Sequence, residues 1–120
     1  MKKIFISTVV IVSALAACKT TKTSTETKSV ALDCSGKTFT YALDIKPIME
    51  QYCTSCHNKN EKAGYNLLEL EFVKKAATNG YLLGTIKHAS GFSPMPEMAP
   101  KMDQPTIDKI ECWINNGMKE

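Results

Sequence analysis

Two cysteines and a histidine lie within five positions of this chain, in the segment CTSCH at residues 53–57. Three chemistries use such a group: a zinc site, a dithiol redox pair and the covalent attachment of a haem. Structural zinc takes four protein ligands, and the sequence holds no second pair at a matching spacing, since His88 is alone. A thioredoxin-like pair opens a helix after a strand, whereas this pair closes a segment with helical periodicity. The pattern therefore favours haem attachment.

Haem attachment uses each reactive residue of this segment. Cys53 and Cys56 are three positions apart, so on a helical turn both thiols project to one side and can form thioethers with the two vinyl groups of one porphyrin. His57 follows directly and can place its imidazole on the iron. The spacing C-x-x-C-H is a signature of such attachment. We therefore expect one haem c, bound through both cysteines.

The N-terminal stretch MKKIFISTVVIVSALAAC is typical of an export signal. Two lysines precede an apolar run at residues 4–15, which is shorter than the roughly 20 apolar residues of a membrane span. The run ends in LAAC, which resembles the lipobox of bacterial lipoproteins. That resemblance implies removal of residues 1–17 and acylation of Cys18. An ordinary secretory signal followed by a chance cysteine is the alternative.

Residues 18–30 are expected to form a disordered tether, because the segment KTTKTSTETKS at 19–29 has no apolar residue. The folded domain is expected at 31–120. Once Lys2 and Lys3 are removed, 13 of the 15 basic residues face 12 acidic ones, so the net charge is about +1. There is no arginine, and the lysines are scattered. These features give no support to a nucleic-acid partner.

The first half of the domain predicts an arm and two helices. Residues 31–42 alternate loosely and are expected to form a short hairpin or an extended arm. A helix is predicted over 44–57, with Asp44 as its N-cap and Pro47 in its first turn. A second helix is predicted over 66–80, with Asn66 and Glu69 as a capping box and a glycine stop at its end.

The second half predicts a helical turn, a stiff loop and a final helix. Residues 81–91 are expected to form one short helical turn and a loop. The segment FSPMPEMAPKMDQP at 92–105 holds four prolines, so it predicts an extended loop. The last helix should begin after Asp103 and stop at Gly117. Its apolar face is expected to hold Ile107, Ile110, Trp113 and Ile114. Together these elements predict an all-α domain of three to four short helices.

Residues 43–117 resemble the small class I c-type cytochromes. The resemblance is carried by the helix entering CTSCH, then YLLGTIKHASGFSPMP, and then TIDKIECWINNG. It is closest to the lipid-anchored monohaem cytochromes of bacterial cell envelopes. It implies a cytochrome c-like fold around one haem and His57 as an axial iron ligand.

The second axial ligand implied by the resemblance is Met95, the methionine of SPMP. A thioether is a soft ligand that suits iron in a redox role and raises its reduction potential. The flanking prolines would stiffen the loop that presents it. Met98 and Met102 are competitors whose simpler role is packing. His88 is a minor candidate, more simply a surface residue.

Two cysteines remain, and in an oxidising compartment leftover thiols tend to pair. A helical wheel at about 100° per residue turns Cys112 away from the apolar face of the last helix. We therefore hypothesise a Cys34–Cys112 disulfide that holds the arm across this helix. Two free or intermolecular thiols are the alternative.

The expected function is that of a membrane-tethered one-electron carrier, not an enzyme. Its partners would be redox proteins of the bacterial cell envelope, on the periplasmic side, and no small-molecule substrate is expected. One alternative is an electron-entry subunit of a larger oxidase or reductase. Another is a haem peroxidase or ligand sensor with an open sixth coordination site, which requires that Met95 does not bind.

Overall fold

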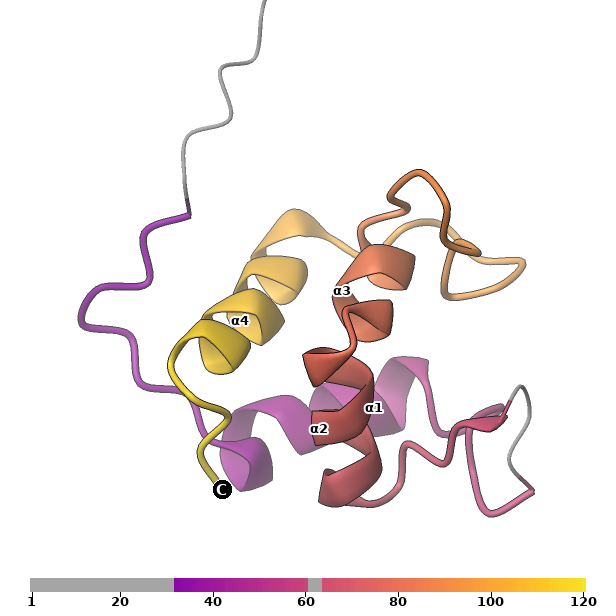
Figure 1. The fold of residues 1–120 in the computed structure, drawn as a ribbon, viewed down its shortest axis with the longest axis horizontal. Helices are drawn as coiled ribbons and strands as arrows, with labels where there is room; N and C mark the ends of the chain where they lie inside the picture. The colour runs from indigo at the N-terminus through magenta and orange to yellow at the C-terminus, as the bar shows by residue number, and fades with distance from the viewer. Residues whose placement is uncertain (1–31, 61–63) are drawn as a thin grey trace, which may run out of the picture. The chain divides into compact units, whose positions relative to one another are not determined.

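The computed structural model describes residues 32–60 and 64–120. The chain divides into two units, Met1–Val30 and Ala31–Glu120, and every described residue belongs to the second. Regular structure in the described residues is entirely helical, which confirms the all-α class. In chain order the elements are the π-helical turn η1 (Tyr41–Ile45) and the helices α1 (Lys46–Tyr52), α2 (Leu70–Thr78), α3 (Tyr81–Ile86) and α4 (Gln104–Asn115) (Figure 1).

The expected signal sequence, the lipidation site Cys18 and the tether all lie outside the described residues. Among the helices that the structure describes, none combines the length and apolar character needed to cross a membrane.

The first helical segment begins earlier than the sequence predicts, and Asp44 is not its N-cap. Thr40 occupies that position, and its hydroxyl accepts a hydrogen bond from the Leu43 N–H at 3.4 Å. Asp44 instead accepts from the Thr40 N–H at 2.8 Å, so the two side chains cap the turn reciprocally. Pro47 lies in the first turn of α1, directly after η1, and has no N–H to donate to the helix.

The second helix is shorter than predicted, because the capping box does not form. Asn66 is buried, and its side-chain oxygen accepts from the Leu68 N–H at 3.2 Å in a local turn. The helix α2 therefore begins only at Leu70, after Glu69 in an extended conformation. Gly80, at φ +79°, ends it and also precedes α3, so these two helices are joined by a very short turn.

The last helix follows its prediction closely. Asp103 caps α4 by accepting from the Thr106 N–H at 3.1 Å, and Gly117 lies just beyond its end at φ +88°. Ile107, Ile110 and Trp113 are fully buried, while Ile114 at the same face is half-buried. Each such side chain contributes about 1.5–3 kcal/mol through burial.

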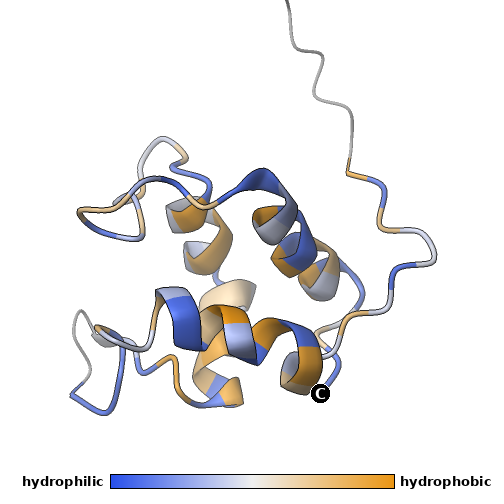
Figure 2. Cartoon of the chain, turned by 180° about the vertical axis from the view of Figure 1, so that it is seen from behind, coloured by the Kyte–Doolittle hydropathy of each residue, from blue (hydrophilic) through white to orange (hydrophobic). Residues whose placement is uncertain are grey.

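The core forms where α4 packs against η1 and α3. Trp113 lies beside Tyr41 with 6.1 Å between ring centroids, and its indole N–H donates to the Lys119 carbonyl at 2.8 Å. Ile45 and Met49 are buried in the same cluster. Polar and apolar residues alternate along the helices, as expected of helices with one buried face (Figure 2).

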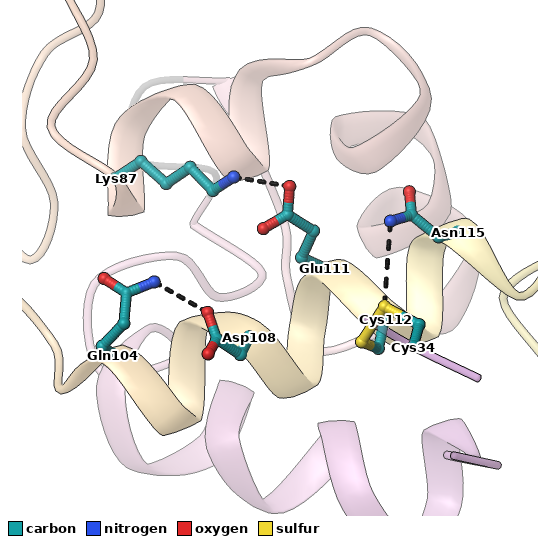
Figure 3. A network of polar contacts seen from close by, with 7 residues as sticks. All are labelled: Cys34, Lys87, Gln104, Asp108, Glu111, Cys112 and Asn115. Carbon is teal, nitrogen blue, oxygen red and sulfur yellow. Dashed lines mark hydrogen bonds and ion pairs between the residues drawn. A yellow bond between two sulfur atoms is a disulfide. The ribbon is translucent and has the colours of Figure 1, made fainter. Parts of the chain in front are cut away.

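The two leftover cysteines, Cys34 and Cys112, are joined by a disulfide in the structure (Figure 3). Of the arm predicted at 31–42, residues 32–40 form no strand, so the hairpin alternative is wrong. Apart from one turn they have no regular secondary structure, and residues 41–42 belong to η1. The arm is tied further to the C-terminal end of the chain. Asn116 donates from its side chain to the Lys37 carbonyl at 2.8 Å. Cys112 is fully buried at this contact, which explains how a residue off the main apolar face avoids solvent.

Replacement of both disulfide cysteines, Cys34→Ser with Cys112→Ser, should lower the free energy of unfolding by about 2–4 kcal/mol, because the bond closes a long loop with a sequence separation of 78. Urea denaturation of the non-reduced proteins measures the difference. As a control, a reducing agent should lower the stability of the wild type by a similar amount and leave the double variant unchanged. Equal stability of the non-reduced proteins would contradict the prediction.

Candidate functional site

The attachment segment, CTSCH at residues 53–57, lies in a turn and not in a helix. The helix predicted over 44–57 is therefore wrong at its C-terminal end, as it is at its N-terminal end. The helix α1 stops at Tyr52, and Cys53 leaves the helical conformation at φ −121°. The side-chain amide of Asn58 donates to the carbonyls of Thr54 and Ser55, at 3.3 Å each. A continuing helix would use those carbonyls for its own N–H groups, so Asn58 favours the turn.

The turn nevertheless brings the three reactive residues together. The N–H groups of Cys56 and His57 both donate to the Cys53 carbonyl, at 3.2 and 2.8 Å. The Cys53 N–H in turn donates to the Met49 carbonyl at 2.8 Å, so the segment is attached directly to the last turn of α1. Met49 is buried in the core, which fixes where the segment begins.

The two thiols of this segment differ in environment. Cys56 is exposed, whereas Cys53 is partly buried, and neither is in a disulfide. Burial raises the pKa of the Cys53 thiol to about 11, because the apolar surroundings disfavour the thiolate. At neutral pH this thiol therefore stays protonated.

The segment that follows returns over the attachment turn. The Leu67 N–H donates to the His57 carbonyl at 2.9 Å, and Leu67 itself is buried in the core. The backbone of His57 is therefore held on one side by Cys53, which follows α1, and on the other by Leu67, which precedes α2. The His57 side chain is half-buried.

Met95 lies in the loop between α3 and α4 and is held by the end of α3. Its N–H donates to the Thr85 carbonyl at 3.1 Å, and its carbonyl is 3.0 Å from Nε2 of His88. The residue is half-buried. Figures 1 and 2 both show this loop on the same side of the helices as the turn that follows α1.

The other two candidate methionines lie in different environments. Met102 is 5% exposed and belongs to the hydrophobic core, so its sulfur is already used in packing. Met98 is fully exposed, at φ +62°. His88 is exposed, as expected of a surface residue, but its ring contacts the Met95 backbone. Burial thus distinguishes Met95 from both of its competitors.

Phe92, at the start of the same loop, rests directly on a glycine of α3. A Cβ built on Gly84 would lie 2.6 Å from three carbon atoms of the Phe92 ring. The Phe92 ring also packs against Tyr81 in a T-shaped arrangement, with 5.8 Å between ring centroids. This packing fixes where the loop leaves α3, and no local sequence pattern predicts it, because a helical glycine has no special motif.

The candidate residues include the groups that a haem c would need. The described residues contain no group of three His, Cys, Asp or Glu side chains that could hold a metal ion. They do contain two thiols and an imidazole in one turn, and a half-buried thioether in a loop. Those are the groups that form two thioether links and two axial bonds to a haem.

Comparison with known proteins gives no family for this chain. No family model, no curated protein and no solved structure matches it.

The substitution Gly84→Ala should lower the free energy of unfolding by about 1–3 kcal/mol, because the added methyl group collides with the Phe92 ring. Alanine in an ordinary helix would instead stabilise by up to about 1 kcal/mol. A double-mutant cycle with Phe92→Ala, in which urea denaturation gives the stability of each variant, measures the coupling between residues 84 and 92. If Gly84→Ala costs as much in the Phe92→Ala background as in the wild type, the contact is not the cause.

Proposed function

We propose that this chain is a monohaem c-type cytochrome that carries single electrons between redox proteins of a bacterial cell envelope. In this proposal Cys18 carries the lipid anchor and the domain binds one haem c. The turn in which the N–H groups of Cys56 and His57 both donate to the Cys53 carbonyl is the observation that carries it. The proposal includes a cytochrome c-like arrangement of the helices around the cofactor.

The haem, when bound, supplies an iron that cycles between ferrous and ferric states. The chain's own residues do the rest. Cys53 and Cys56 would fix the porphyrin covalently, and His57 and Met95 would hold the iron. A thioether is a weak donor to ferric iron and so favours the ferrous form. No substrate bond is made or broken, so no acid or base is required.

The domain from residue 32 onward carries little net charge, which is compatible with transient binding of partners. From residue 32 onward the chain holds 10 lysines and 11 acidic residues, so its net charge is about −1, or about −3 with two haem propionates. Strong electrostatic steering is therefore not expected. Small and largely apolar docking surfaces are typical of transient electron-transfer complexes.

The full-length chain, expressed in a bacterium that matures c-type cytochromes, should yield a coloured protein whose intact mass includes one haem. A pyridine haemochrome spectrum should show that both vinyl groups are consumed. Cys53→Ala with Cys56→Ala should lose the covalent haem, whereas the matched control Cys34→Ser with Cys112→Ser should keep it. A colourless wild type without bound tetrapyrrole would sink the proposal.

Met95→Leu should abolish the sulfur-to-iron charge-transfer band in the red region of the ferric spectrum, because leucine offers no donor. Met98→Leu, a change at a fully exposed methionine, is the matched control and should leave the band intact. High-spin ferric haem in the wild type would instead favour an open sixth site and with it a peroxidase or sensor. If the band survives in Met95→Leu, another methionine is the ligand and the assignment of Met95 is wrong.

A further inference from the structure

Both backbone polar groups of Met95 are held by residues at the end of α3. Its N–H donates to the Thr85 carbonyl at 3.1 Å, and its carbonyl oxygen is 3.0 Å from Nε2 of His88. The neighbouring residues Pro94 and Pro96 have no N–H to donate. The backbone of the loop is therefore fixed at Met95 from both sides of the Cα atom.

The His88 ring reaches the loop because the chain turns sharply at this residue. His88 follows α3 and its cap and adopts φ +55°, in the left-handed region. Its own N–H donates to the same Thr85 carbonyl, at 3.1 Å. Histidine, like asparagine, enters this region more readily than most residues. The turn leaves the ring exposed and out of the core, so core packing does not explain it.

We infer that His88 is a positioning residue for Met95: its ring holds the Met95 carbonyl and so presents the thioether from a fixed backbone. This inference rests on the proposed function, because it assumes that Met95 binds the haem iron. A carbonyl oxygen only accepts, so Nε2 of His88 is the donor in this hydrogen bond.

A weak ligand gains most from being held in place. Without the hydrogen bond from His88, the loop samples more conformations when Met95 is not bound to iron. Binding of the Met95 sulfur then costs more conformational entropy, which weakens the bond to iron. External ligands such as imidazole compete for the same position. Their apparent affinity for the ferric protein therefore reports how firmly Met95 is held.

The test uses His88→Asn in the mature, haem-loaded protein. Asparagine tolerates the left-handed backbone, but its side chain is too short to take the place of Nε2. The ferric protein is titrated with imidazole, and loss of the red charge-transfer band monitors binding. His88→Asn should bind imidazole roughly three- to ten-fold more tightly than the wild type, which is the effect of one net hydrogen bond. His88→Gln, which restores a donor near the Nε2 position, should recover much of the difference.

Lys87→Gln is the matched control. It removes the ion pair between Lys87, the C-cap of α3, and Glu111 of α4 (Figure 3). Both hydrogen bonds of Met95 stay in place. Its imidazole affinity should equal that of the wild type. Hydrogen exchange of the Met95 amide gives a readout that does not depend on iron, and it should be faster in His88→Asn than in Lys87→Gln.

The outcomes separate the two proposals. A haem-loaded His88→Asn protein that matches the wild type in imidazole affinity and in Met95 amide exchange overturns the positioning role alone. The same holds if Lys87→Gln changes both quantities as much as His88→Asn does. A wild type that carries no covalent haem, or no red band to titrate, overturns the proposed ligation and this inference with it.

Discussion

The packing of α4 against the first helical segment is the contact on which the rest of the domain depends. Trp113 and Ile110 of α4 are fully buried against a cluster that includes Ile45 and Met49. The carbonyl of Met49 also receives the first hydrogen bond of the attachment segment. A shift of α4 would therefore move not only the core but also the turn that holds Cys53.

The residues of the proposed haem site lie in irregular segments, and the helices position those segments. The attachment turn is hydrogen-bonded to the end of α1, and the loop that holds Met95 is hydrogen-bonded to the end of α3. A domain of this size buries a limited apolar surface by itself. In the proposed holoprotein, two covalent links and two axial bonds would join segments that the helices alone hold only at their ends.

The sequence predicts an element well where its signals are local and agree. In α4 the cap Asp103 and the apolar periodicity mark the same helix, and the structure follows them. Prediction fails where a polar side chain has two possible uses: Asn66 caps a turn and not a helix, and Asn58 takes carbonyls that a helix would need. The site residues lie in recognisable motifs, but the hydrogen bond of His88 depends on a left-handed turn that no local pattern encodes.

The position of the disulfide has a mechanical consequence. The bond joins Cys34 to Cys112, so the attachment turn and the methionine loop both lie within one covalently closed ring of the chain. A pulling force applied between the N-terminal segment and the C-terminus would pass across the two sulfur atoms and bypass that ring. In the proposed holoprotein, such a load would cross the domain at Cys34 and Cys112, and the segments that hold the haem would carry none of it.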